Sequence, residues 1–323
     1  NTLLLPAYLG AHSVLMSPVR FIKNPRTWLS AITEYQATIG GAPNFAYDHC
    51  LERIQAHQLA GLDLSSWRIA FNAAEPLDAS TLMRFCERFS RVGFKESAVF
   101  AAYGMAEATV FICGGKHATP YLANTFASDA LQQGKAQLYR CEGKPQVLIA
   151  HGHVQPAHSL KIISPTTLTE VPEGEVGEIW FAGPSLAKGY WNDEVKTKAS
   201  FGAHLANDKQ SYLRTGDLGF IHQGELYISG RIKDVMIIKG RNYYPQDFEK
   251  LAYNVYPGLN QNGAAAFEFN GNAVLLLEIS RNEMRDFDFK MAAETIKAAI
   301  FEQFEVVLED VVFMKSGHIN RTS

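Results

Sequence analysis

Two polar clusters between Tyr212 and Glu249 carry residues that could bind a ligand, and both interrupt strand-like sequence. The first is Arg214-Thr215-Gly216-Asp217, and the second is Gly230-Arg231-Ile232-Lys233-Asp234. Asp217 follows a glycine, which predicts a tight turn that a ligand can approach closely. Its carboxylate can accept two hydrogen bonds at once, as a ribose diol requires, and the Arg231 guanidinium can donate to phosphate or hydroxyl oxygens. Taken singly, each cluster is more often a solvated loop.

Two further segments follow predicted strands, where ligands of open α/β sheets commonly bind. They are Asn72-Ala73-Ala74-Glu75 and Tyr103-Gly104-Met105-Ala106-Glu107. The small residues of the first leave room for a flat base, and Tyr103 offers an aromatic face for stacking. Glu107 supplies a hard oxygen ligand that suits Mg²⁺ bridging triphosphate oxygens. On spacing alone, a core aromatic at Tyr103 and a solvated helical Glu107 are the more frequent alternatives.

The elements that position these segments alternate between helix and strand over the first third of the chain. Apolar runs predict strands at Arg68–Phe71 and Ala98–Ala102, and Asp78 is expected to cap a helix between them. An earlier helix should start at Asn24-Pro25 and end at Gly40-Gly41, its buried face formed by Trp28, Ile32, Tyr35 and Ile39. Strands alternating with helices indicate an α/β fold with a mainly parallel, doubly wound sheet.

The pattern changes twice further along the chain. Short strands predict an antiparallel, partly barrel-like β subdomain over 151–232, at Leu160–Ile163, Gly177–Phe181 and Glu225–Ser229. A small α+β domain is then predicted over 233–323, with a helix opened by Pro245, a hairpin turning at Asn270-Gly271, a helix over Phe289–Phe304 and a strand over Val311–Met314. We therefore expect a large domain, 1–232, divided into 1–150 and 151–232, and a small domain after it.

The bulk composition is that of an ordinary globular protein of about two domains, with 323 residues, 47% apolar and 20% charged. The net charge of −3 predicts no broad basic surface for nucleic acid. The cysteines are far apart, which favours a reducing cytosol and hence a cytoplasmic protein; they are Cys50, Cys86, Cys113 and Cys141. No apolar run reaches the ~20 residues of a membrane span, and no signal peptide pattern is present.

Three stretches together resemble motifs of the adenylate-forming superfamily of acyl-CoA synthetases, peptide-synthetase adenylation domains and luciferases. They are GRIKDVMIIKGRNYYPQDFE at 230–249, YGMAEAT at 103–109 and FAGPSLAKGYW at 181–191. Within the superfamily, the likeness is greatest to the fatty acyl-AMP ligases and extends over nearly the whole chain. The fold that this implies is a large domain, built from an α/β sheet and a small β-barrel-like subdomain, followed by a small α+β domain.

The resemblance implies that a fatty acid reacts with Mg·ATP to give an acyl-adenylate and pyrophosphate. The acyl group would then pass to the phosphopantetheine of an acyl carrier protein, or to a polyketide or peptide synthase. It implies catalytic functions for Glu107, Arg231 and Lys233, with Glu107 also the metal ligand and Lys233 the hinge between the domains. The residues implied to bind the nucleotide are Asn72, Ala73, Ala74, Glu75, Tyr103, Gly104, Met105, Ala106, Asp217 and Arg231.

Several features depart from the superfamily pattern. Ala106 stands where many relatives carry threonine, a departure shared with the fatty acyl-AMP ligases. The Ser/Thr/Gly-rich pyrophosphate loop is missing, and Ile319–Ser323 resembles the approach to a catalytic lysine that the residues do not reach. Since the chain also starts at Asn1 rather than at methionine, we expect a fragment that is not fully competent by itself.

Residues 114–146 match an insertion that the fatty acyl-AMP ligases carry and that is thought to restrain the small domain and disfavour CoA. If so, the segment should be ordered and pack Tyr121, Leu122, Phe126 and Leu131 on the large domain, and its deletion should raise acyl-CoA formation. A tolerated surface loop is the alternative. For the whole chain, the alternatives are an acyl-CoA ligase of the same fold and a non-catalytic nucleotide-binding relative.

Overall fold

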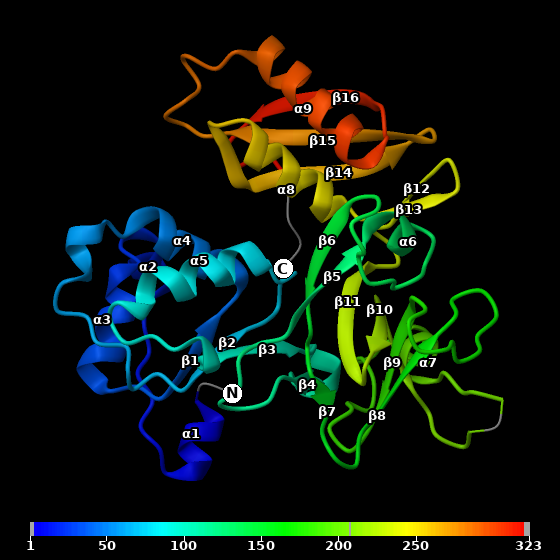
Figure 1. Cartoon of the computed structure of the whole chain (residues 1–323). Coiled ribbons are helices and arrows are strands. Elements are labelled where there is room, and N and C mark those ends of the chain that lie inside the picture. Colours follow the sequence, from blue (N-terminus) through cyan, green and yellow to red (C-terminus); the bar gives the residue numbers. More distant parts are fainter. Residues whose placement is uncertain (1–2, 207, 320–323) are drawn as a thin grey trace.

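The structure is a computed structural model that describes residues 3–206 and 208–319, so of the motif approach at Ile319–Ser323 only Ile319 falls within it. Its elements form three groups, seen in Figure 1 as an α/β layer mainly in blue and cyan, an antiparallel sheet in green to yellow-green, and a C-terminal group in yellow, orange and red. Within the described ranges, every helix is too short or too polar to traverse a lipid bilayer.

The α/β layer is built on a five-stranded sheet of order β1-β2-β3-β4-β7, in which β1, β2 and β3 are parallel. The predicted parallel sheet is confirmed for these strands, but β4 and β7 extend it in antiparallel direction. The elements of this layer are α1 (Leu4–Leu9), α2 (Pro18–Lys23), α3 (Arg26–Tyr35), β1 (Ile39–Ala42), α4 (Asn44–Arg53), β2 (Ile69–Asn72), α5 (Ala79–Ser90), β3 (Val99–Tyr103), β4 (Cys113–Gly114) and β7 (His153–Val154).

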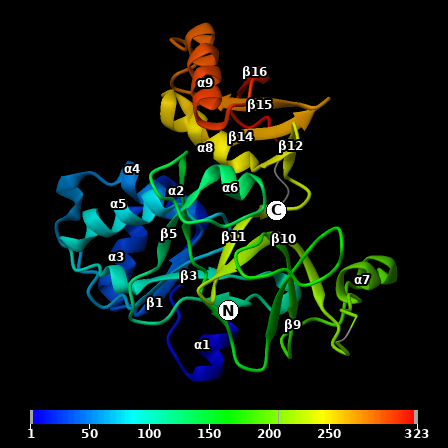
Figure 2. The ribbon, with the colours of Figure 1, turned by 45° about the vertical axis from the view of Figure 1, so that its right-hand side comes forward.

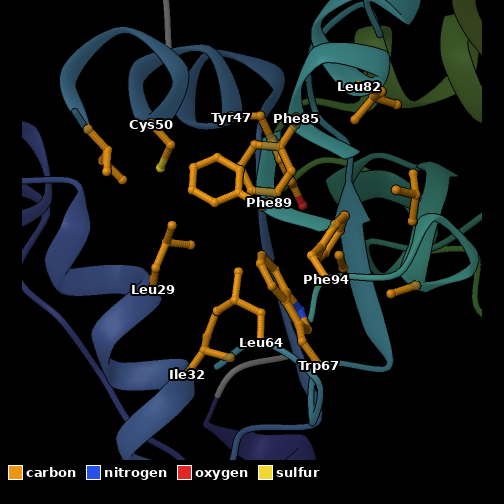
Figure 3. Close-up of a cluster of buried hydrophobic side chains, with 14 of the residues drawn as sticks. Leu29, Ile32, Tyr47, Cys50, Leu64, Trp67, Leu82, Phe85, Phe89 and Phe94 are labelled. Atoms are coloured by element: carbon orange, nitrogen blue, oxygen red, sulfur yellow. The ribbon is translucent and has the colours of Figure 1, made fainter. Parts of the chain in front are cut away.

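Helices α3, α4 and α5 share one aromatic-rich core with the sheet (Figure 3). Phe85 and Phe89 of α5 are fully buried and pack ring against ring, with centroids 4.4 Å apart, while Tyr47 of α4 meets Phe85 edge to face. Because all three helices contribute to this single cluster, they cover the same side of the sheet, and the double winding stays a prediction. The Asp78 cap is confirmed, since its carboxylate accepts from the Ser80 amide at 2.8 Å.

The predicted end of the first helix is wrong. Helix α3 stops at Tyr35, and Gly40 and Gly41 lie in β1, paired with Ala70 and Phe71 of β2. Ile39 is 63% exposed rather than part of a buried helical face. The helical spacing of the apolar residues did not decide the structure here. Strand β1 forms because its backbone pairs with β2, a contact that the spacing of its own side chains does not reveal.

The antiparallel sheet has the order β11-β10-β9-β8, and it includes a long strand, β10, that the sequence pattern did not reveal. A two-stranded ribbon, β5 with β6, lies against it, and the bridge between Ala150 and Tyr227 joins the end of β6 to β11. The elements are β5 (Ala123–Ala127), α6 (Ser128–Gln132), β6 (Pro145–Ile149), β8 (Ser159–Ile163), β9 (Gly177–Ala182), α7 (Glu194–Phe201), β10 (Leu213–His222) and β11 (Glu225–Arg231).

The prediction that residues 114–146 are ordered is confirmed, although the segment is not a long loop but holds β5, α6 and the start of β6. Phe126 and Leu131 are buried in a cluster with Phe220 and Tyr227 of the antiparallel sheet. Tyr121 packs against the α/β core, whereas Leu122 is 42% exposed, so its predicted packing is wrong. A deletion of 114–146 would remove part of a core, which makes it an unsuitable test of function.

The C-terminal unit, residues 236–319, has a three-stranded sheet of order β14-β15-β16 with its own buried cluster. The predicted hairpin is confirmed, because Asn270 (φ 52°) and Gly271 (φ 82°) both adopt the left-handed backbone of a two-residue turn. The helix predicted over Phe289–Phe304 is confirmed as well. The elements are β12 (Met236–Ile238), β13 (Arg241–Tyr243), α8 (Pro245–Val255), β14 (Leu259–Phe269), β15 (Asn272–Ile279), α9 (Phe289–Phe304) and β16 (Leu308–Lys315).

The C-terminal unit contacts the rest of the chain beside α6, as Figures 1 and 2 both show. Lys250 of α8 forms an ion pair of 2.8 Å with Asp78, the cap of α5. Gln146 of β6 donates to the Asp247 carboxylate of α8 at 3.2 Å, and Lys144 donates to the main-chain carbonyl of Glu302. Residues 144–146 therefore touch the C-terminal unit directly, as a restraint on it would require.

Asp247 makes this contact sensitive to pH. Burial raises its pKa to about 7 from 3.8, so its contribution to stability is present below about pH 4 and is lost as the pH rises through about 7. Asp247→Asn, which stays neutral, should match the wild-type free energy of unfolding near pH 4 and exceed it by about 2–4 kcal/mol above pH 7. Urea unfolding between pH 4 and 8 measures this difference.

The exposed Asp286 provides the matched control. Asp286→Asn should leave the difference from wild type flat across the same pH range. A flat difference for Asp247→Asn would contradict the role assigned to its burial.

Candidate functional site

Three of the predicted nucleotide-binding residues meet in one cluster. The Tyr103 hydroxyl at the end of β3 donates to Asp217 Oδ2 at 2.7 Å, across 114 residues of sequence. Arg231 Nε donates to Asp217 Oδ1 at 3.0 Å, and the two residues face each other in the β10–β11 register. The carboxylate of Asp217 is thus the shared acceptor of a tyrosine and an arginine from two different sheets.

The electrostatics of this cluster keep its groups in defined protonation states. Burial raises the pKa of Asp217, while the hydrogen bond from Tyr103 and the charge of Arg231 oppose that rise. Burial also raises the pKa of Tyr103 well above its usual value, and the Asp217 charge adds to the effect, so Tyr103 stays a neutral donor. The Arg231 side chain is 71% exposed, which leaves its remaining N–H groups open to a ligand.

Asp217 lies within strand β10 and not on a separate turn, so that prediction is wrong in detail. The strand is kinked at this point, since Gly216 has a φ of 74° and the pairing with β9 shifts between Arg214 and Leu218. The Thr215 hydroxyl donates to the Ile179 carbonyl at 2.7 Å and accepts from the Asp217 amide at 3.1 Å. Position 216 requires glycine, because residues with a side chain rarely adopt a positive φ.

A buried carboxylate on the neighbouring strand holds the kink. Glu178 of β9 is 2% exposed, and it accepts from the Gly216 amide at 3.2 Å and from Trp180 Nε1 at 2.9 Å. Arg214 donates to the same carboxylate through Nε at 2.9 Å and through Nη2 at 2.8 Å. The charge of Glu178 is therefore compensated by one cation and two neutral donors.

Removing that cation should destabilise the protein. Arg214→Ala leaves the Glu178 carboxylate buried without its counter-charge, which should lower the free energy of unfolding by about 3 kcal/mol. Urea unfolding followed by circular dichroism measures the loss. Lys161→Ala is the control, because it breaks the exposed pair with Glu170 and should cost under about 1 kcal/mol. An equal, small effect of both variants would contradict the role of Glu178.

The end of β2 carries an unpaired acceptor. Asn72 is fully buried, and its Nδ2 donates to Asn44 Oδ1 at 3.1 Å, whereas its own Oδ1 has no hydrogen-bond partner among the described residues. Ala74 adopts a left-handed backbone (φ 71°), which costs free energy and is frequent at binding sites. Glu75 accepts from the Phe45 amide at 3.0 Å, so its carboxylate braces the segment. Ala73 lies between these constrained residues.

Glu107 is held by a residue that the sequence reasoning did not single out. Glu107 lies in a short 3₁₀ turn, Ala106–Ala108, and its Oε1 accepts from the Tyr190 hydroxyl at 2.6 Å. Tyr190 belongs to the 181–191 motif, so the signal was present, but its partner was not evident. Before the turn, Gly104 has no room for a side chain, because a Cβ would lie 1.6 Å from the Val110 carbonyl oxygen; Met105 packs on the adjoining core.

Lys233 lies in the turn between β11 and β12 and is exposed. It lines a cavity of about 470 Å³ together with residues of α8 and β14, among them Glu249 and Phe267. In the described part of the chain, no hydrogen bond or ion pair joins Asp217 to Glu107 or to Lys233. The convergence of Asp217, Arg231 and Glu107 in one cleft therefore stays a prediction.

Comparison with known proteins identifies a family and several relatives that this chain resembles. The model of the family described as AMP-binding enzyme matches residues 1–191, and that of the Disco-interacting protein 2-like AMP domain matches residues 233–323. The medium-chain-fatty-acid–[acyl-carrier-protein] ligase JamA of Moorena producens is 40% identical over 99% of this chain and 56% of its own length.

Solved structures give the same result for the fold. A structure from a study of fatty acyl-adenylate ligases of E. coli and L. pneumophila matches with a TM-score of 0.89 and 32% identity, over 99% of this chain and 56% of the other. The L. pneumophila fatty acyl-adenylate ligase in complex with acyl adenylate and pyrophosphate matches with a TM-score of 0.72 and 36% identity, over 99% and 57%. The chain spans about half the length of the curated relatives that it matches.

Proposed function

The chain belongs to the AMP-binding enzyme family, and on that premise we propose that it activates a fatty acid with ATP to give a fatty acyl-adenylate and pyrophosphate. The phosphopantetheine thiol of an acyl carrier protein, alone or within a polyketide or peptide synthase, then attacks the acyl carbon, so that a thioester forms and AMP leaves. Likeness to JamA and to the fatty acyl-adenylate ligases over nearly the whole chain supports this substrate class. The free cysteines support a cytoplasmic location.

The observation that carries the proposal is the cluster of Tyr103, Asp217 and Arg231. The buried carboxylate of Asp217 joins the ends of two sheets. It accepts two hydrogen bonds within the protein and can accept more from a ligand. In this proposal Asp217 accepts from the ribose hydroxyls, Arg231 donates to the sugar or phosphate, and Tyr103 packs on the adenine. The unpaired Asn72 Oδ1 is a suitable acceptor for a donor group on the base.

Glu107 fits a metal that arrives with the nucleotide. One of its oxygens accepts from Tyr190, and the other makes no hydrogen bond within the described residues. Mg²⁺ at such sites is held by one or two carboxylates together with substrate phosphates, so a single free carboxylate oxygen is enough. When bound, Mg²⁺ neutralises charge on the triphosphate. The protein holds the nucleotide and positions the free oxygen of Glu107.

We also propose that the chain divides at Lys233 into a large and a small domain. The buried cluster of the C-terminal unit contains only residues from Met236 to Val311, whereas the α/β core ends at Ile149, which supports separate domains. Within 1–232, the α/β layer and the antiparallel sheet are two groups that interleave along the chain, because β5 and α6 pack on the antiparallel sheet whereas β7 joins the α/β sheet, so a division near residue 150 stays a prediction. The contacts of residues 144–146 with α8 and α9 support a restraint on the small domain, which would favour a carrier protein over CoA.

The test is pyrophosphate release by the full gene product with Mg·ATP, with and without a series of fatty acids. We expect release that requires a fatty acid, followed by acyl transfer to a holo carrier protein. Transfer to free CoA at a comparable rate would favour an acyl-CoA ligase instead. Binding of ATP without pyrophosphate release for any fatty acid would favour a non-catalytic relative.

A further inference from the structure

Two loops that are distant in sequence are joined by three hydrogen bonds around Glu107. Besides the bond from the Tyr190 hydroxyl to Glu107 Oε1, the Ala187 amide donates to the Glu107 carbonyl at 2.7 Å. The Thr109 hydroxyl donates to the Ser185 carbonyl at 2.6 Å. Both the backbone and the side chain of Glu107 are thus fixed by residues 185–190.

Tyr190 is itself held in place from several sides. Its amide donates to the Thr197 hydroxyl of α7 at 2.8 Å. The Lys196 ammonium lies over its ring, 4.4 Å from the centroid, and Phe201 meets the ring edge to face at 5.3 Å. A donor whose ring and backbone are both anchored loses little further entropy when its hydroxyl holds a carboxylate, so Glu107 is kept in one orientation.

We propose that Tyr190 is a positioning residue for the metal-bearing carboxylate: it occupies one oxygen of Glu107 and keeps the other available to the divalent cation that accompanies ATP. The proposal rests on the function proposed above for Glu107. Residues that hydrogen-bond a metal-ligating carboxylate typically change metal affinity about 10–100-fold when they are removed. Tyr190 acts through Glu107 alone and needs no contact with the nucleotide.

A purely structural role for Tyr190 is the alternative, and the chain offers a matched control for it. Tyr212 donates to Asp208 Oδ2 at 2.7 Å, a bond of nearly the same length on the same sheet subdomain. Neither residue belongs to the proposed nucleotide site. Tyr212→Phe therefore removes a tyrosine–carboxylate hydrogen bond without touching Glu107.

The experiment is direct binding of Mn²⁺ to the full gene product in the presence of a non-hydrolysable ATP analogue, followed by electron paramagnetic resonance. We expect Tyr190→Phe to raise the Mn²⁺ dissociation constant about tenfold and Tyr212→Phe to leave it unchanged. Glu107→Gln should weaken binding further, and adding Tyr190→Phe to Glu107→Gln should then have no additional effect. Circular dichroism melts of each variant establish that it is folded.

The outcomes separate this inference from the function on which it rests. Wild-type Mn²⁺ affinity in Tyr190→Phe, with affinity lost in Glu107→Gln, would overturn the role of Tyr190 and leave the proposed function standing. If Tyr190→Phe lowers Mn²⁺ affinity equally with and without Glu107→Gln, Tyr190 acts on the fold rather than through Glu107. That result would also overturn the positioning role of Tyr190. Wild-type affinity in Glu107→Gln would remove the metal role of Glu107 and the inference with it.

Discussion

Asp217→Ala is expected to lower the rate of acyl-adenylate formation at low ATP concentration by about 100-fold or more. The variant loses the acceptor of two ribose hydrogen bonds, each worth about 1.5–3 kcal/mol when one partner is charged. It also releases the Tyr103 hydroxyl and the Arg231 guanidinium, which both donate to this carboxylate. Pyrophosphate release by the full gene product, measured against ATP concentration, gives kcat/KM for ATP.

Asp208 is the matched control for this substitution, because it also accepts from a tyrosine hydroxyl at 2.7 Å, that of Tyr212, outside the proposed site. Asp208→Ala should keep ATP kinetics close to those of the wild type. If Asp217→Ala is folded and keeps wild-type ATP kinetics, Asp217 does not bind the ribose.

Lys233→Pro is expected to impair one half-reaction far more than the other, by about tenfold or more, since a hinge must absorb a large backbone change and proline fixes φ. The substitution removes no main-chain hydrogen bond, because the Lys233 amide donates none within the described residues, unlike those of Ile232 and Asp234. Single-turnover assays measure acyl-adenylate formation and acyl transfer separately.

Lys233→Ala separates the backbone effect from that of the side chain. It removes the ammonium group but leaves φ free. The ratio of the two half-reaction rates should therefore stay much closer to that of the wild type than in Lys233→Pro. Equal losses of both steps in a folded Lys233→Pro protein would argue against a hinge at this residue.

Where local chemistry decides the structure, the sequence predicted it well. The Asp78 cap, the Asn270-Gly271 turn and the helix Phe289–Phe304 each depend on residues adjacent in sequence, and each was found where expected. The failures involve distant partners. Strand β1 exists because β2 lies beside it, and β10 runs through the polar Arg214–Asp217 cluster because Glu178 of β9 accepts the donors of its kink.

The candidate site shows the same division. The motifs identified Tyr103, Asp217 and Glu107 as candidate site residues. For Tyr103 they predicted stacking by the ring but no hydrogen bond from its hydroxyl. Its bond to Asp217 spans 114 residues, and that from Tyr190 to Glu107 spans 83. Contacts of this range depend on how two sheets meet, which no local pattern encodes.

The length of these connections has a consequence for the order of folding. The C-terminal unit closes its buried cluster with residues from Met236 to Val311, a contiguous stretch that needs no contribution from upstream. Asp217, in contrast, meets Tyr103 only after a loop of 114 residues has closed, and Asn124 meets Tyr227 across 103. The entropy cost of closing a long loop is met before its contacts can stabilise it, so contacts between residues distant in sequence form slowly. The C-terminal unit should therefore acquire its structure early and independently, and the nucleotide cluster should be among the last parts of the chain to form.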